Sequence, residues 1–178
     1  MRHRRCSGRV VAADSNLALI SPTRAPSWIS WRTSALILPD VNVLVYASRD
    51  DAPRHHEYRS WLESVVRSPL PFGLSELVLS GVVRIVTHPR IFATPTPLEE
   101  ALSFVTTLRR HPNAVAIAPG VRHFDLFRQL CIAARTSGNL VADAYLAALA
   151  IESGSEWITD DRDFARFSGL RWRHPLDD

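Results

Sequence analysis

The stretch ALILPDVNVLVYA, from Ala35 to Ala47, decides the fold of this chain. Its first four residues form a short apolar run with a proline after it, which predicts a central strand, and residues 41 to about 48 follow as a helix. Asp40 stands between the two, inside a segment that is otherwise almost wholly apolar. Burying an ionised carboxylate costs free energy unless the charge is paired. Asp40 is therefore either a local cap of the helix that follows it or one of several acids that share a site.

Beyond this stretch, short apolar runs alternate with segments of helical periodicity. The further predicted strands cover residues 71–74, 114–118, 156–159 and, at an edge, 170–173. The predicted helices cover residues 53–68, 76–88, 97–111, 121–138 and 139–154, with a helical turn at 161–167. Strands that alternate with helices form a parallel sheet that is covered on both faces. The sequence therefore predicts an α/β fold in three layers, with a small parallel sheet of four to five strands flanked by helices.

Residues 1–34 differ in composition from the rest of the 178-residue chain. Residues 1–35 hold six arginines and a single acid, whereas residues 36–178 hold 15 arginines and 17 acids, so the net charge of +3 comes from the first segment. We interpret residues 1–34 as a disordered arm or an over-extended start, and residues 35–178 as one domain. The basic balance is accordingly weak support for a nucleic-acid face on that domain.

Composition also excludes several classes of protein. The chain has no lysine, so chemistry that needs a lysine is excluded. It contains no apolar run of about 18 residues or more, so no membrane span is expected. Its two cysteines, Cys6 and Cys131, make neither a disulfide framework nor a zinc site. A reducing compartment, the cytoplasm, is the expected location.

Four acids occupy positions where α/β folds build sites. Asp40, Glu76 and Asp161 each follow a predicted strand, and the carboxyl ends of parallel strands share one edge of the sheet. Asp143 lies in the first turn of a helix that is otherwise nearly all apolar. Each acid alone has a structural alternative, because carboxylates also cap helices and complement the helix dipole.

Taken together, the four acids predict a metal site. Two carboxylates ~4 Å apart repel each other by roughly 4 kcal/mol at an effective dielectric of about 20, so a cluster needs cations. No arginine lies close in sequence to Asp40 or Asp143. A divalent ion is the other solution, and ligands that are all oxygen select Mg²⁺ or Mn²⁺. A hard ion held by carboxylates polarises a phosphate and lowers the pKa of a bound water, which is the chemistry of phosphodiester hydrolysis.

Four segments, LPDVNVLVYA, SELVLSGVVRIVTHPRIF, LVADAYLAALA and WITDDRDFARFSGLRW, carry a resemblance to a known family. In this order and spacing they resemble PIN-domain ribonucleases, in particular the VapC-type toxins of bacterial toxin–antitoxin pairs. The resemblance covers residues 36–176 and leaves out the segment before Ala35. It implies a PIN-like domain and Mg²⁺-dependent, or Mn²⁺-dependent, endonucleolytic cleavage of RNA.

The resemblance also implies roles for individual residues. It makes Asp40, Glu76 and Asp143 metal-binding acids, with Asp161 as the fourth. Asp163 is the rival for that fourth position, and Asp160 is a weaker one. Beside them, the resemblance assigns the orientation of carboxylates or water to Asn42 and Thr159, with Asp163 in the same supporting role if Asp161 is the fourth acid.

The function implied by the resemblance has partners and alternatives. The partners are an RNA substrate, a cognate protein antitoxin and a second copy of the chain, with no membrane involved. Arg84 and Arg162 are candidates for contact with RNA or the antitoxin, weighed against a structural role or a solvated surface. The alternatives to a toxin are an RNA-processing PIN nuclease and a PIN-like binding module without catalysis.

Overall fold

The structure, a computed structural model, describes residues 36–177, so the predictions made for residues 1–34 lie outside the described residues. Along the described part of the chain the elements are β1 (Ile37–Pro39), α1 (Val41–Ser48), α2 (His55–Arg67), β2 (Phe72–Leu74), α3 (Glu76–Val86), α4 (Leu98–Arg109), β3 (Ala114–Ala116), α5 (His123–Ala134), α6 (Leu140–Ser153), β4 (Glu156–Ile158), the 3-10 helix η2 (Arg162–Arg166) and β5 (Trp172–Arg173). None of the helices in this part is long and apolar enough to cross a membrane.

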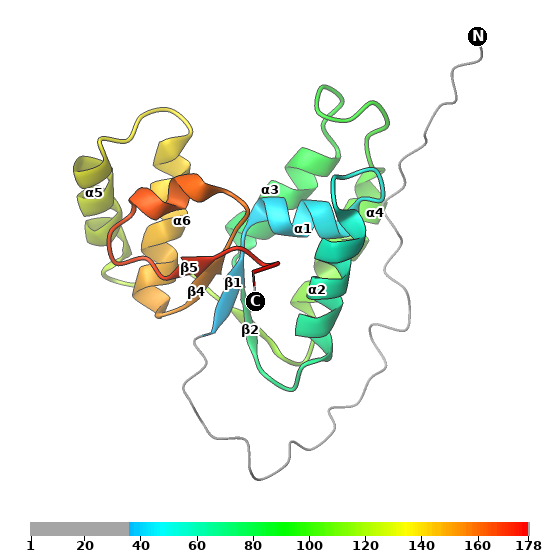
Figure 1. Ribbon diagram of the computed structural model, residues 1–178, viewed down its shortest axis with the longest axis horizontal. Helices are drawn as coiled ribbons and strands as arrows, with labels where there is room; N and C mark the ends of the chain where they lie inside the picture. Colours follow the sequence, from blue (N-terminus) through cyan, green and yellow to red (C-terminus); the bar gives the residue numbers. More distant parts are fainter. Residues whose placement is uncertain (1–35, 178) are drawn as a thin grey trace.

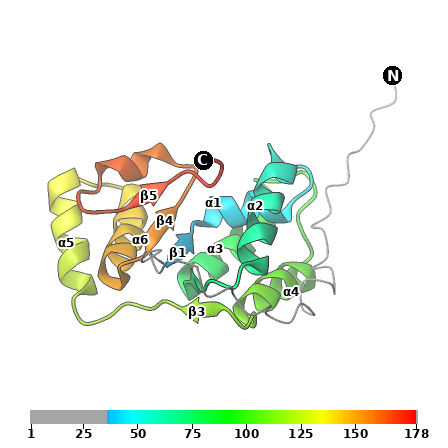
Figure 2. The ribbon, with the colours of Figure 1, turned by 60° about the horizontal axis from the view of Figure 1, so that its bottom comes forward.

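The five strands form one parallel sheet in the order β3-β2-β1-β4-β5 (Figure 1). β1 lies at the centre, where Ile37 pairs with Phe72 of β2 and with Glu156 of β4. In Figures 1 and 2, α5 and α6 gather on one side of the strands and α1 to α4 on the other. The predicted α/β fold, with a small parallel sheet flanked by helices, is therefore confirmed. The sheet brings the ends of β1 and β4 side by side.

Burial of large side chains holds these short strands in place. Leu38 of β1, Phe72 of β2 and Trp157 of β4 are at most 1% exposed. α6 packs on β4 and buries small side chains, which let a helix approach a sheet closely. These buried side chains are Ala144, Ala147, Ala148 and Ala150. The apolar sequence of α6 is thus explained by packing, which leaves Asp143 as the exceptional residue of its first turn.

Among the helices that are shorter than the sequence predicts, α2 and α5 have a backbone cause. α2 begins at His55 because Arg54 before it adopts a left-handed conformation, with φ of 56°. α5 ends at Ala134 because Arg135 does the same, with φ of 49°. A left-handed conformation is unusual for a residue with a Cβ atom, so the sequence does not predict these two helix ends.

A buried arginine ties the end of α1 to the loop between α3 and α4. Arg49 has no exposed side-chain surface, and its guanidinium forms two hydrogen bonds with the carboxylate of Asp51, at 2.6 and 2.8 Å. It also donates to Thr96 Oγ1 at 2.8 Å and to the Thr94 carbonyl at 3.1 Å. Its Cζ atom lies 3.8 Å from the ring centre of Phe92. Arg49 therefore fixes the shape of this loop.

α3 comes very close to α1 at Gly81. A Cβ atom at position 81 would stand 2.9 Å from Cγ2 of Val41, which is nearer than Cβ atoms come to their neighbours in proteins. Val41 is β-branched and stiff, and it follows Asp40 directly. Gly81 therefore sets the distance between α3 and the first turn of α1.

Candidate active site

Asp40 stands at the junction of β1 and α1. Its backbone N–H continues the sheet by donating to the Ile158 carbonyl at 2.8 Å. Its Oδ1 accepts from the Val41 N–H at 2.6 Å, and its Oδ2 accepts from the Thr159 hydroxyl at 2.7 Å. The residue is 5% exposed. Asp40 is thus a helix cap and also a buried carboxyl group that is fixed in orientation by two elements.

The surroundings of Asp40 disfavour its ionised form. Burial raises the pKa of Asp40 to about 6, although the hydrogen bonds from Thr159 and Val41 oppose the rise. The negative charges of Asp143 and Asp161 raise it further. Burial also raises the pKa of Asp143, and so do the charges of Asp161 and Asp163, while Arg166 lowers it. Asp40, Asp143 and Asp161 therefore form a group of carboxylates that repel one another, which we call the acid cluster.

Asp161 reaches the acid cluster through the loop that follows β4. Its N–H donates to Thr159 Oγ1 at 3.0 Å, and the same oxygen donates to Asp40. Its Oδ1 accepts from the Asp163 N–H at 2.8 Å, which caps η2. Thr159 is fully buried, so one hydroxyl fixes both Asp40 and the turn that carries Asp161.

The rivals of Asp161 are engaged elsewhere. Asp163 is exposed and pairs with Arg166, with 2.6 Å between Oδ1 and Nη2. Asp160 accepts from the Tyr58 hydroxyl at 2.8 Å and lies 2.7 Å from His174 Nε2. Of the three aspartates in this loop, Asp161 is the one without a cationic or histidine partner among the described residues.

Glu76 is bound to an arginine of α4 and has no hydrogen bond to another acid among the described residues. Its side chain is 74% exposed, and Oε1 accepts from Nη2 of Arg109 on α4 at 2.8 Å. As the first residue of α3 it complements the helix dipole, which is the structural alternative weighed above. The face of α3 that packs against α1 carries Gly81 instead. Glu76 is therefore not counted in the acid cluster, and its role as a metal-binding acid stays a prediction.

Asn42 and Arg162 follow members of the acid cluster closely in the chain, whereas Arg84 lies at the far end of α3 from Glu76. Asn42 lies half-buried in the first turn of α1, and the structure gives its amide no hydrogen-bond partner within residues 36–177. Arg162 on η2 is exposed, directly after Asp161, and Arg84 is exposed in the last turn of α3. Neither arginine forms an ion pair with another described residue. Both guanidinium groups are thus available to an anionic ligand.

The donor set of the acid cluster suits a hard dication. It offers carboxylate oxygens that repel one another, and Arg166, the cation that acts on Asp143, is itself bound to Asp163. Within residues 36–177, however, no three acid, histidine or cysteine side chains are already grouped as a metal site. Since a bound dication would remove the mutual repulsion, the donor chemistry of these residues fits Mg²⁺.

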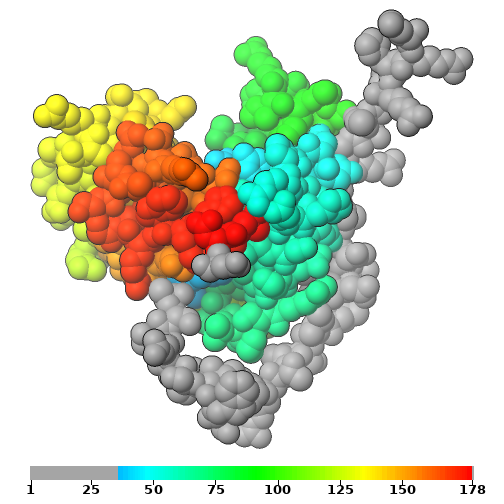
Figure 3. All heavy atoms as spheres, in the orientation of Figure 1, coloured from blue at the N-terminus to red at the C-terminus, as the bar shows by residue number. Residues whose placement is uncertain are grey.

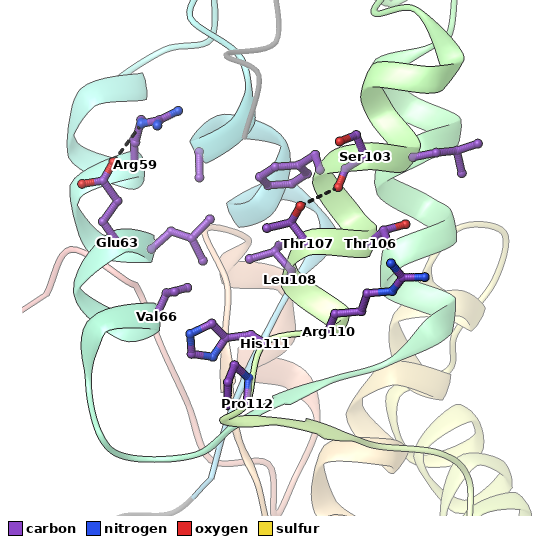
Figure 4. A pocket seen from close by; sticks show the side chains of 14 residues that line it. Arg59, Glu63, Val66, Ser103, Thr106, Thr107, Leu108, Arg110, His111 and Pro112 are labelled. Carbon is purple, nitrogen blue, oxygen red and sulfur yellow. Dashed lines mark hydrogen bonds and ion pairs between the residues drawn. The ribbon is translucent and has the colours of Figure 1, made fainter. Parts of the chain in front are cut away.

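A pocket lies away from the acids, between α2 and α4. It has a volume of about 450 Å³ and mostly apolar walls that include Leu62, Val66 and Leu108. Figure 4 shows the Arg59–Glu63 ion pair at its rim, with 3.0 Å between Nε and Oε1. No member of the acid cluster lines it. Its chemistry is that of an apolar binding surface, so the chemical site is the acid cluster.

Sequence reasoning missed one residue beside the acid cluster. Burial raises the pKa of Tyr46 on α1, and the charges of Asp160, Asp40 and Asp161 raise it further. An aromatic residue in an apolar stretch is typical of a core position, so only the position of Tyr46 near Asp40 in the sequence could have drawn attention to it.

The chain is similar in sequence to a known protein family and to proteins of known name. The sequence model of the PIN domain family matches residues 37–170. Ribonuclease VapC43 of Mycobacterium tuberculosis is 46% identical over 142 residues, which cover 80% of this chain and 97% of that protein. Ribonuclease VapC25 of the same organism is 39% identical over 140 residues, covering 79% and 99%.

Two solved structures share the fold. The first is VapBC-1 from nontypeable Haemophilus influenzae, with a TM-score of 0.59, 15% identity and coverage of 80% of this chain and 99% of that one. The second is VapBC2 from Rickettsia felis bound to a DNA fragment from their promoter, with a TM-score of 0.56, 17% identity and coverage of 78% and 98%.

Proposed function

The chain belongs to the PIN domain family, and from this premise we propose that it is a Mg²⁺-dependent endoribonuclease that hydrolyses RNA phosphodiester bonds. Its similarity to proteins named ribonucleases supports the activity. The observation that carries the proposal is the acid cluster, in which a buried Asp40 with a pKa of about 6 faces two further carboxylates. Carboxyl groups that disfavour one another's ionisation are typical of a functional site, because a bound cation would stabilise their ionised forms.

Mg²⁺ bound at the acid cluster would polarise the scissile phosphate and lower the pKa of an attacking water. Asp40 and Asp143 would hold the ion, since the charge of Asp161 raises the pKa of both carboxyl groups. Thr159 keeps one oxygen of Asp40 in a fixed direction. Asp161 would orient the attacking water and accept its proton, because its second oxygen is free of the cap bond to Asp163. Departure of the 3′ oxygen would leave a 5′ phosphate on the other product.

The proposal includes a biological setting. The chain would be the toxin of a type II toxin–antitoxin system, act in the cytoplasm and be neutralised by a protein antitoxin. Support comes from the VapC names of the relatives. A homodimer is also proposed, in keeping with the exposed apolar residues of α5, where Phe124 is 69% and Ile132 65% exposed. Arg84 and Arg162 would contact RNA phosphates or acidic groups of the antitoxin.

The test is cleavage of total RNA in the presence of Mg²⁺. We compare the wild type with Asp143→Asn, and we use Asp125→Asn as a matched control because Asp125 is also an aspartate in the first turn of a helix, α5. The wild type and Asp125→Asn should cut RNA, and EDTA should stop them, whereas Asp143→Asn should be inactive although folded. Equal activity in Asp143→Asn and the wild type would refute the site. An antitoxin gene directly upstream would separate a toxin from a processing nuclease.

A further inference from the structure

Tyr46 lies beside the acid cluster and has no role in the proposed chemistry described so far. It is half-buried on α1, and its ring packs edge-on against Tyr58 of α2, with 5.1 Å between ring centres and 69° between planes. Tyr58 is 2% exposed and donates its hydroxyl hydrogen to Asp160, the residue before Asp161. The contact with Tyr58 therefore places the Tyr46 ring next to the loop that follows β4.

Three hydroxyl groups lie around the acids, and two of them are engaged. Thr159 donates to Asp40 and Tyr58 donates to Asp160. The Tyr46 hydroxyl has no hydrogen-bond partner among residues 36–177, and it is not a buried, unsatisfied group either. Since burial and the charges of Asp160, Asp40 and Asp161 all raise the pKa of Tyr46, its phenol keeps its proton and remains a donor.

Tyr58, against which Tyr46 packs, is held by contacts with Asp160 and His174. Leu176 N–H donates to Nδ1 of His174, which leaves the ring proton on Nε2 for Asp160, 2.7 Å away. The same nitrogen lies 3.2 Å from the Tyr58 hydroxyl. Figure 3 shows the C-terminal residues, in red, against the cyan surface of α2. The C-terminal segment thus locks Tyr58, and Tyr58 in turn limits the positions open to Tyr46.

An RNA strand that enters this region meets carboxylates that repel its phosphates. Arg166 is bound to Asp163, so this guanidinium is already paired. A guanidinium in the place of Tyr46 would bring a positive charge near Asp40 and Asp161 and compete with a metal ion for them. A phenol donates a hydrogen bond without neutralising the acids. Tyr46 can therefore donate a hydrogen bond to a phosphate while the acid cluster stays available to a metal ion.

We propose that the Tyr46 hydroxyl donates a hydrogen bond to a phosphate oxygen of the RNA chain bound at the acid cluster, and that Tyr58 is the positioning residue that holds it there. This inference rests on the proposed ribonuclease function. It identifies a substrate contact from an uncharged side chain on α1. The contact exists in the ground state and in the transition state alike, so its loss should act mainly on KM.

The variant that tests the proposal is Tyr46→Phe, which keeps the ring and removes the hydroxyl. The matched control is Tyr145→Phe, because Tyr145 is also half-buried but packs against His123, 4.2 Å between ring centres. The probe is a fluorescein-labelled RNA oligonucleotide that spans a cleavage site mapped with the wild type. Cleavage kinetics are measured with Mg²⁺, and affinity is measured by anisotropy in the Asp143→Asn background.

Tyr46→Phe should raise KM and weaken RNA affinity by about tenfold or more, since hydrogen bonds to charged groups have that strength. Its kcat and melting temperature should stay close to the wild type, and Tyr145→Phe should change none of these values. Unchanged KM and affinity in Tyr46→Phe would overturn the proposal, and so would a lower melting temperature with unchanged affinity, which indicates packing alone. If the wild type itself cuts no RNA, the proposed function fails and the inference fails with it.

Discussion

Replacement of Asp40 by asparagine should make the metal-free protein more stable while removing its activity. In the unfolded chain the carboxyl group ionises near its ordinary pKa of 3.8, and in the folded chain near 6. A folded-state pKa above the unfolded one means that stability falls as the pH rises through this interval. At pH 8 the cost is about 3 kcal/mol, from the difference between the two pKa values.

The asparagine variant avoids this cost but loses one hydrogen bond. Its amide oxygen can still accept from the Val41 N–H, whereas its NH₂ group cannot accept from the Thr159 hydroxyl, a loss of about 1 kcal/mol. The net gain at pH 8 is about 2 kcal/mol, or roughly 5 °C in melting temperature. At a pH near 4.5 the cost of ionisation falls to about 1 kcal/mol, so the two effects cancel and the gain should vanish.

The assay is urea unfolding in EDTA at both pH values, with Asp125→Asn as the control that should show no pH-dependent gain. Adding Mg²⁺ at pH 8 should stabilise the wild type and leave Asp40→Asn unchanged, because a ligand that binds only the folded state raises stability. A variant that is less stable than the wild type at pH 8, or equally stabilised at both pH values, would refute the reasoning. So would Mg²⁺ stabilisation of Asp40→Asn as large as that of the wild type.

Three further predictions concern the surroundings of the site. Glu76→Gln should keep kcat/KM within about twofold of the wild type in RNA cleavage, because its exposed ion pair with Arg109 is of the kind that contributes at most about 1 kcal/mol; a hundredfold loss would return Glu76 to the site. Thr159→Val removes a hydrogen bond that lowers the pKa of Asp40, so the acidic limb of the pH–rate profile should move to higher pH, and an unmoved limb would contradict the link. Arg49→Met should lower the free energy of unfolding by about 3 kcal/mol in a urea titration, since it removes a fully buried ion-pair partner; a change under about 1 kcal/mol would contradict the anchoring role of Arg49.

The fold was largely predictable because strands and helices differ in period and in their boundaries. Apolar runs marked β1, β2, β3 and β4, and the short β5 appeared at the edge where it was expected. Ser75 caps α3, with its hydroxyl 3.3 Å from the Leu77 N–H, and Gly154 ends α6 in a left-handed conformation. Arg54 and Arg135 take the same left-handed conformation without being glycine, so the limits of α2 and α5 were missed.

The candidate site was predictable only in part, because sequence shows where a residue lies along an element and not where its side chain points. The charges of Asp143 and Asp161 act on Asp40 because the ends of β1 and β4 are neighbours and α6 packs on β4. Glu76 follows a strand in the same way, but Arg109, which is 33 residues further along the chain, attracts its carboxylate. Tyr46 was not predicted for a related reason. Its hydroxyl gains a possible role only from the charged aspartates of other segments, which the sequence alone does not place beside it.

The close contact between Gly81 and Val41 makes Gly81 a position where a substitution could inactivate the protein without changing an acid. Any side chain at position 81 would push Val41, and with it the start of α1, away from its place. Under the proposed toxin function, a selection for cells that survive expression of the gene should therefore recover substitutions at Gly81 as well as substitutions of the aspartates. Cells with a substitution at Gly81 would survive although all the aspartates of the site are intact. Under the proposed function, the presence of the acidic motif would therefore overestimate the number of related genes that still encode an active toxin.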